Sequence, residues 1–238
     1  MKHVEELKTA LSYLAIPEKA EFFPRFFKSD PGQYAEGDVF LGVTVPDQRK
    51  IVKEFWNKLD LGEVQSLLSS EVHEHRHVAL LILVEKYQKA KDLHSQKEMV
   101  DFYLENKKYI NNWDLVDNSC YKILGHYCYE NHQDNILVNL AEEDSMWSKR
   151  IAVVSTLYYV KQNSFKLLKN IVLKNLRHPH DLIHKANGWV LREMGKKNEQ
   201  ELIEFLALHY QNMPRTTLRY AIEKFDDETR QRYLKGQI

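Results

Sequence analysis

The sequence predicts an all-α protein built from stacked helical hairpins, and three observations support this. The 238 residues include only 8 glycines and 6 prolines, most of them between apolar segments. Apolar residues recur every three or four positions along almost the whole chain, as on one face of a helix. The resulting segments, about 10–18 residues long, are joined by short polar links, as helical hairpins require.

The predicted helices follow one another from the N-terminus. A first apolar stripe, from Val4 to Leu14, ends at Pro17, and a second helix at about 17–28 carries four phenylalanines. Residues 30–42 form the one long loop, after which Pro46 starts a helix that runs through Trp56. Further helices are expected at about 62–70, 73–90, 94–108, 112–129, 133–142, 145–162, 164–177, 180–196, 198–211, 214–224 and 226–235.

Three of these helices begin alike, which indicates an internal repeat. The segments at Arg76, Lys149 and His184 each start with basic residues and continue with small and apolar ones. His77 and Arg150 are 73 residues apart, and Arg150 and Lys185 are 35 apart. A repeat of about 36 residues fits both separations, the first as two repeats and the second as one. We therefore expect HEAT-like repeats in one domain, residues 1–238, forming a curved α-solenoid whose corresponding helices line a concave face.

The charge distribution favours a polyanionic partner, although the net charge is zero. Residues 148–197 hold eleven lysines and arginines against two acids, a net +9, and the other 188 residues together carry −9. We therefore expect the concave face to be basic and to bind nucleic acid. The alternative is that these charges are spread over solvated helix faces.

One helix face carries candidate chemistry. Trp113 and Asp117 are four residues apart and share a face, and a ring beside a carboxylate attracts a cationic ligand twice. Arg150 follows Trp113 by 37 residues and Trp189 follows Arg150 by 39, so repeat packing would bring them to the same wall. The alternative is that the tryptophans belong to the core and that an acid such as Asp114 only starts a helix.

At these residues the sequence resembles the AlkD family of HEAT-like repeat DNA glycosylases. The matching pieces follow the family order from residue 17 to at least 193, with a weaker echo at Arg219. They are Pro17-Glu18-Lys19-Ala20-Glu21, Phe40-Leu41-Gly42-Val43 with Pro46 and Arg49, Trp113-Asp114-x-Val116-Asp117, Trp147 with Arg150, and Lys185-Ala186-x-Gly188-Trp189-Val190-Leu191-Arg192-Glu193.

The resemblance implies monofunctional excision of cationic N3- and N7-alkylated purines from double-stranded DNA, without a deep base pocket, a cofactor or a metal. Asp117 would be the catalytic carboxylate, with Trp113 and Trp189 around the damaged nucleotide and Arg150 on the DNA backbone. Other DNA-binding residues expected are Phe26, Lys149, Lys185, Arg192 and Arg219. The chain departs from the family pattern at Asn112, where a second tryptophan is common, and at Phe26, where a DNA-contacting tyrosine is expected.

Two other functional classes compete with this interpretation. His73-Glu74-x-x-His77 matches the zinc protease signature, but it lies at a helix start with no evident third ligand, so a solvated helix start is the simpler reading. A HEAT-like scaffold that binds DNA or protein without catalysis is the other alternative. A scaffold gives no reason for Asp117, both tryptophans and Arg150 to occur together.

The sequence also indicates where the protein works. No apolar run approaches the ~18 residues that a membrane span needs, and the first residues include acids where a secretory signal would be apolar. Cys120 and Cys128 lack metal-binding spacing and fit buried, reduced thiols. We expect a cytoplasmic monomer.

Overall fold

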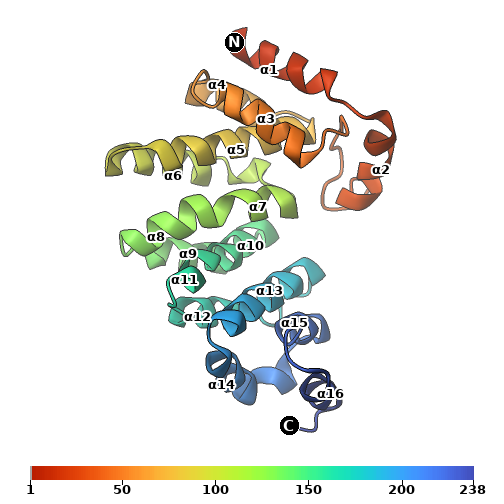
Figure 1. Ribbon diagram of the computed structural model, residues 1–238, viewed down its shortest axis with the longest axis vertical. Helices are drawn as coiled ribbons and strands as arrows, with labels where there is room; N and C mark the ends of the chain where they lie inside the picture. Colours follow the sequence, from red (N-terminus) through yellow and green to blue (C-terminus); the bar gives the residue numbers. More distant parts are fainter. Residues whose placement is uncertain (1) are drawn as a thin grey trace. The chain divides into compact units, whose positions relative to one another are not determined.

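Helices account for most of the chain in the computed structural model, which describes residues 2–238 (Figure 1). Within that range the strand-type pairing is one isolated parallel bridge between Val39 and Val72. The predicted all-α class is therefore confirmed. None of the helices described is long and apolar enough to cross a membrane.

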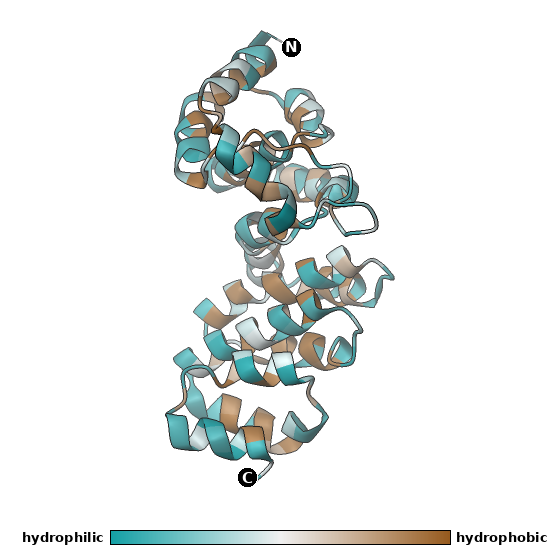
Figure 2. Ribbon diagram, turned by 90° about the vertical axis from the view of Figure 1, so that its right-hand side faces the viewer, coloured by the Kyte–Doolittle hydropathy of each residue, from teal (hydrophilic) through white to brown (hydrophobic). Residues whose placement is uncertain are grey.

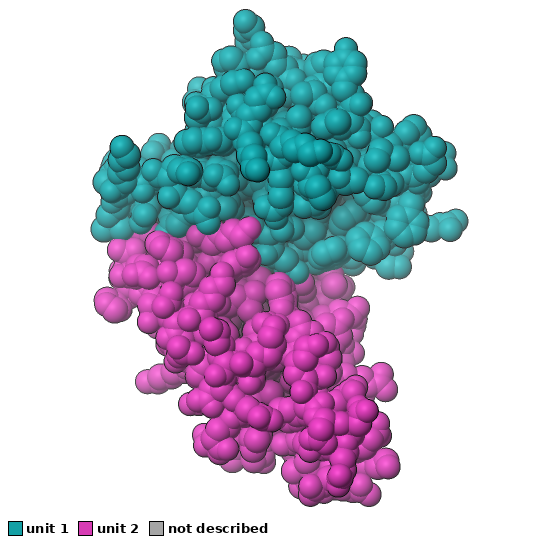
Figure 3. All heavy atoms as spheres, viewed as in Figure 1, with its two compact units in different colours: residues 1–119 teal, residues 120–238 magenta. Residues whose placement is uncertain are grey.

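The helices gather into two compact units, residues 1–119 and residues 120–238 (Figure 3). The boundary falls inside one helix, so no linker of turn-forming residues marks it in the sequence. Most helices in both units carry hydrophilic and hydrophobic residues on the same element, as the hydropathy colours show (Figure 2). The single-domain expectation for residues 1–238 stays a prediction.

Unit 1 holds the aromatic helix, the long loop and the helix with Trp113. Thr44 caps α3 by accepting the N–H of Asp47, and a reciprocal pair of hydrogen bonds between Asp60 and Glu63 caps α4. Its elements are α1 (Lys2–Tyr13), α2 (Pro17–Phe27), α3 (Val45–Phe55), α4 (Leu61–Leu68), α5 (His73–Lys89), α6 (Leu93–Glu105), the 3-10 helix η1 (Lys107–Tyr109) and α7 (Trp113–Cys120).

The centre of unit 1 is α5, which packs against α3, α4 and α6. Residues 73–84 of this helix are all buried, so this part of the helix has no solvated face. A helix surrounded by neighbours is normally apolar all round. Here the first five residues, His73 to His77, are polar and buried nonetheless, which requires each to have partners from other segments.

Unit 2 is organised around α13 (Asp181–Lys197), which packs against α10, α11, α14 and α15. Gly188 allows the closest of these approaches, because a Cβ there would lie 2.4 Å from the Cβ of Tyr220. The other elements are the π-helix η2 (Tyr121–Gly125), α8 (His126–Glu130), α9 (Asp134–Glu142), α10 (Met146–Ser155), α11 (Leu157–Lys161), α12 (Lys166–Lys174), α14 (Glu199–His209), the 3-10 helix η3 (Tyr210–Asn212), α15 (Arg215–Ala221) and α16 (Asp227–Lys235).

The observed helices match the predicted ones except that two are interrupted. The predicted helix 112–129 contains a π-helical turn, and the predicted helix 145–162 breaks at Thr156. The two irregularities adjoin: a Cβ at Gly125 would lie 2.3 Å from the carbonyl oxygen of Ser155. The Thr156 hydroxyl also donates to the carbonyl of Val153 at 2.6 Å, a local bond that competes with helical pairing. The break at Thr156 therefore has a local contribution, and the close approach of Gly125 to Ser155 places the two interruptions side by side.

The helix starts follow the predicted repeat register. His77, Arg150 and Lys185 are each the fifth residue of their helix, in α5, α10 and α13 respectively. Trp113 and Trp189 do not share that register, because Trp113 is the first residue of α7 and Trp189 is the ninth of α13. The repeat thus aligns the basic helix starts, and the two tryptophans occupy different turns of their helices.

Gly42 fixes the end of the loop before α3, and its substitution tests that role. Gly37 and Gly42 both have positive φ, but a Cβ at Gly42 would lie 2.2 Å from the carbonyl oxygen of Ile16, whereas one at Gly37 meets nothing within 4 Å. We predict that Gly37→Ala costs about 1 kcal/mol of unfolding free energy. Gly42→Ala should cost about 1–3 kcal/mol more, because the backbone of α2 must move. Urea unfolding of both variants measures the difference, and equal losses would contradict it.

Candidate functional site

The first turn of α7 carries the face predicted from the sequence. Trp113 and Asp117 lie one turn apart and are both half-buried, while Leu115 and Val116 are fully buried in the core. Both residues therefore keep part of their surface open to solvent. A cationic group placed there would meet both an aromatic ring and a carboxylate.

The aromatic helix α2 supports the Trp113 ring. Phe27 is buried and stacks on it with ring centres 5.5 Å apart and planes 19° apart. Phe26 meets the same ring edge-on at 5.6 Å and remains 49% exposed. Phe27 also stacks on Phe40, with ring centres 5.3 Å apart. The loop that carries Phe40 therefore contacts the same group of aromatic rings. The four phenylalanines noted in the sequence thus include two that hold Trp113 in place.

Asn112 links the start of α7 to the end of α2. Its side chain is fully buried; the carbonyl oxygen accepts the N–H of Trp113 at 2.8 Å and the amide donates to the backbone carbonyl of Phe27 at 3.4 Å. The position where the family resemblance leads one to expect a second tryptophan therefore holds a polar connector. A larger ring could not make these two bonds.

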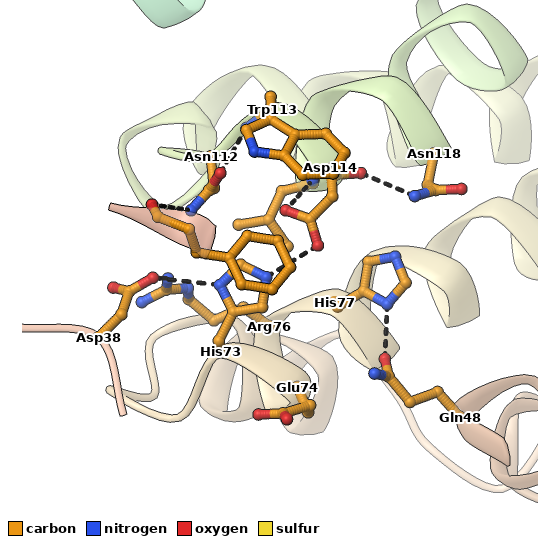
Figure 4. A network of polar contacts seen from close by, with 12 residues as sticks. Asp38, Gln48, His73, Glu74, Arg76, His77, Asn112, Trp113, Asp114 and Asn118 are labelled. Carbon is orange, nitrogen blue, oxygen red and sulfur yellow. Dashed lines mark hydrogen bonds and ion pairs between the residues drawn. The ribbon is translucent and has the colours of Figure 1, made fainter. Parts of the chain in front are cut away.

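Behind Trp113 lies a buried network of charged groups centred on His73, the first residue of α5 (Figure 4). His73 is 2% exposed, and its two ring nitrogens face two carboxylates: Nδ1 lies 3.1 Å from Asp38 and Nε2 lies 2.8 Å from Asp114. Arg76, one turn further along α5, also pairs with Asp38. The network joins the loop, α5 and α7.

The network keeps His73 protonated. Burial by itself would lower the pKa of His73, but the charge of Asp114 and the hydrogen bonds to both carboxylates outweigh it and raise the pKa to about 9. Burial would likewise raise the pKa of Asp114, and the His73 imidazolium holds it below its ordinary value. At neutral pH, an imidazolium therefore sits between two carboxylates.

The zinc-protease signature has a structural role, and the expectation of a solvated helix start is wrong. Glu74 accepts the backbone N–H groups of Leu41, Gly42 and Val43 at 2.8–3.2 Å, and His77 contacts Gln48 at 2.5 Å. The motif residues thus point at different partners. Among residues 2–238, no cluster of three histidine, cysteine or acidic side chains could hold a metal ion.

A basic side chain reaches the same end of α7. Arg49 of α3 is exposed, and its guanidinium lies 3.5 Å from the side-chain oxygen of Asn118, the residue after Asp117. Asn118 in turn donates to the carbonyl of Asp114 at 3.0 Å. The motif piece containing Arg49 is therefore adjacent to the Trp113–Asp117 face in the folded unit.

Two of the four residues predicted to act together lie in unit 2. Arg150 is only 4% exposed, and its guanidinium donates to the carbonyl of Leu182 at 2.5 Å, which ties α10 to the first turn of α13. Trp189 is half-buried on α13, two turns further along that helix. A role for Arg150 or Trp189 toward DNA stays a prediction.

The predicted DNA-binding side chains of unit 2 differ in how they are held. Lys149 is half-buried and Arg219 is exposed, and neither has an ion pair among residues 2–238. Lys185 pairs with Asp181 at 2.8 Å on the same helix. Arg192 pairs with Glu193 and with Glu223 of the segment after α15.

Glutamates from outside residues 148–197 neutralise part of the positive charge of that segment. Lys169 pairs with Glu201 and Lys174 pairs with Glu142, each at 2.5 Å. Each glutamate lies 32 residues from its lysine in the sequence and outside residues 148–197. The net charge of +9 counted over that segment therefore overstates its positive charge in the folded protein. The composition located the basic segment but could not show these pairs.

The chain has recognisable relatives. A sequence model of a family described as DNA alkylation repair enzyme matches residues 7–225. The chain belongs to the DNA alkylation repair enzyme family. One solved structure with the same fold is a predicted DNA alkylation repair enzyme from Enterococcus faecalis, with 18% identity and a TM-score of 0.72, covering 90% of this chain and 97% of that one. A comparison with curated proteins gives no significant match.

Family membership confirms the resemblance seen in the sequence motifs. It gives this member of the DNA alkylation repair enzyme family a role in DNA repair, with DNA as its partner. Sequence reasoning missed His73 and Asp38 as members of the network and treated Asp114 as a helix-start acid. His73 and Asp114 stand at the starts of α5 and α7, whereas Asp38 lies in the loop before α3, so no common sequence pattern marks the three. Which residues they pair with depends on packing between distant segments.

The buried imidazolium makes stability depend on pH. The pKa of His73 is about 9 when folded and about 6.5 when unfolded, so its contribution is complete below pH 6.5 and is lost as the pH rises toward 9. We predict that unfolding free energy falls by about 3 kcal/mol across that interval. Urea unfolding between pH 6 and 9.5 measures this, and His73→Gln should remove the slope. An unchanged slope in the variant would assign it to other groups.

Proposed function

We propose that this protein is a monofunctional DNA glycosylase that hydrolyses the N-glycosidic bond of cationic N3- and N7-alkylated purines. The observation that supports it most directly is the Trp113–Asp117 face at the start of α7, in a member of the DNA alkylation repair enzyme family. Both residues are partly exposed, which is consistent with a nucleotide reaching them without a deep base pocket.

The chemistry needs few protein groups. Alkylation gives the purine a positive charge, so the bond to C1′ breaks with the base leaving as a neutral molecule, and no general acid is needed. The sugar develops oxocarbenium character, which the Asp117 carboxylate would stabilise. A water positioned by the same carboxylate would then form the new C1′–O bond and pass one proton to the carboxylate, which returns it to solvent.

The aromatic rings would recognise the charge of the lesion. A cation over a ring face gains up to ~2 kcal/mol when it is desolvated, and a neutral base of the same shape does not. Trp113 is suited to this because Phe26 and Phe27 fix its ring. Trp189 of α13 is the second ring of the proposal, and its contact with the nucleotide follows from the family resemblance.

Binding to the DNA backbone would come from basic side chains. Lys149, Lys185 and Arg219 offer cationic groups at or near the surface of unit 2, and Arg192 would exchange its glutamate partners for phosphate. Phe26 would contact DNA only through its exposed ring, since it lacks the hydroxyl of a tyrosine. Arg150 would act on the backbone near the lesion.

Replacing the carboxylate tests the chemistry. We predict that Asp117→Asn lowers the rate of 7-methylguanine release from duplex DNA by ~10²–10³, because a neutral amide cannot stabilise the developing positive charge. The variant should bind the same duplex with an unchanged Kd. Single-turnover assays measure the first quantity and fluorescence anisotropy the second.

Neutral lesions are the matched substrates for that assay. Uracil, hypoxanthine and 1,N6-ethenoadenine in the same sequence should remain in place with the wild-type protein, because none carries the charge that activates the leaving group. Full activity of Asp117→Asn would place the chemistry on another residue. Release of neutral bases without release of 7-methylguanine would refute the proposed function.

The salt dependence of binding tests the backbone contacts. We predict that Lys185→Ala weakens binding to every DNA sequence and reduces the slope of log Kd against log salt by about 1, as the loss of one phosphate contact should. Lys97→Ala, on the acid-rich helix α6, is the control and should leave the slope unchanged. If the wild type, Lys185→Ala and Lys97→Ala give the same slope of log Kd against log salt, Lys185 does not contact DNA.

A DNA-binding scaffold without catalysis is the second candidate. Phe26 and Asn112 favour it, because each stands where the resemblance leads one to expect a residue that the glycosylases use. The 7-methylguanine assay separates the two functions: the scaffold binds the duplex and releases no base.

A further inference from the structure

The proposed glycosylase chemistry gives no role to the charged network behind Trp113. We propose that His73 is a positioning residue for the Trp113–Asp117 face, acting through Asp114 on the backbone of α7 and through Phe27 on the Trp113 ring. This inference rests on the proposed function for its effect on activity, but the geometry on which it depends lies entirely within unit 1.

The first path runs through Asp114, the residue after Trp113. Its Oδ2 atom accepts the His73 Nε2–H at 2.8 Å, and its Oδ1 atom accepts the backbone N–H of Leu115 at 2.9 Å. One carboxylate thus joins the start of α5 to the first turn of α7. Asp117 lies three residues further along that turn, so its direction depends on where Asp114 is held.

The second path runs through a stack of rings. The His73 imidazole lies 4.6 Å from the centre of Phe27 with planes 33° apart, and Phe27 stacks on Trp113. Phe40 also lies against the imidazole, at 5.1 Å. An imidazolium held over a ring adds a charge–quadrupole attraction to the packing, so the charged form supports the Trp113 ring better than the neutral form.

The charge on His73 matters because of the groups that surround it. Asp38 from the loop, Asp114 from α7 and Arg76 from α5 face the network, and Asp114 also senses the charge of His77. Loss of the proton would remove one of the two N–H donors, so one carboxylate would be left facing a lone pair. The loop or α7 would then have to shift, and with it the supports of Trp113.

The test begins with wild-type protein labelled with 5-fluorotryptophan, in which Trp113→Phe identifies the Trp113 signal. Positioning by charged His73 predicts that the ¹⁹F resonance of Trp113 moves between pH 7 and 10 with a midpoint near 9. The titration is recorded on the wild-type protein, and Trp113→Phe serves only to assign the resonance. A Trp113 resonance that is constant over this range would overturn the proposal.

Two variants then assign the transition. His73→Gln should abolish the ¹⁹F step and lower the rate of 7-methylguanine release at pH 7.5 about 10-fold, with Kd for DNA unchanged, because a misplaced site slows chemistry more than binding. His75→Gln is the control: it lies on the same helix, is also buried and bonds Ser70 instead. Burial lowers the pKa of His75 to about 4, so it does not titrate in this range.

The outcomes separate this inference from the proposed function. A wild-type protein that releases no 7-methylguanine but shows the His73-dependent ¹⁹F step would refute the glycosylase and retain the positioning role. A folded His73→Gln variant that keeps the step, or that matches His75→Gln in both ¹⁹F spectrum and activity, would overturn the positioning role and leave the glycosylase intact.

Discussion

The buried imidazolium of His73 joins the loop, α5 and α7 of unit 1 next to the Trp113–Asp117 face. His73 faces two buried carboxylates, Asp38 and Asp114, one at each ring nitrogen. Arg76 also pairs with Asp38, so two cationic groups compensate the two carboxylates. Removing one partner from such a set typically costs 3–5 kcal/mol, because a buried charge is left uncompensated. The loop, α5 and α7 meet at this residue, so the position of each depends on it.

Glu74, the next residue of α5, is also buried and polar and also contacts another segment of unit 1. While His73 faces α7, the neighbouring carboxylate accepts three successive backbone N–H groups of the loop that leads into α3. That loop carries Phe40, which packs on Phe27, and Phe27 packs on Trp113. The hydrogen bonds of Glu74 therefore support the Trp113 ring indirectly, through Phe40 and Phe27. A site that must discriminate by charge benefits from a rigid ring, since a mobile one would have to be ordered by the ligand.

The C-terminal unit uses charge differently. Its lysines and arginines are abundant, but several are held by glutamates that lie 31–32 residues away in the sequence. Exposed pairs of this kind contribute little to stability. These glutamates lower the positive charge of residues 148–197 in the free protein, and in the proposed function phosphate groups would replace them. Arg150 differs from these because it is buried and ties α10 to α13.

Local sequence pattern determined the helices, the repeat register of their starts, and the pairing of Trp113 with Asp117. All of these follow from 3.6-residue periodicity and from contacts four residues apart. Helical periodicity does not mark the interruptions at Thr156 and in the π-helical turn, which lie where Gly125 and Ser155 approach each other across distant segments. The meaning of His73-Glu74-x-x-His77 was also decided by tertiary structure. His73 meets Asp38 and Asp114 across 35 and 41 residues, and no periodicity encodes which distant carboxylate a buried histidine will face.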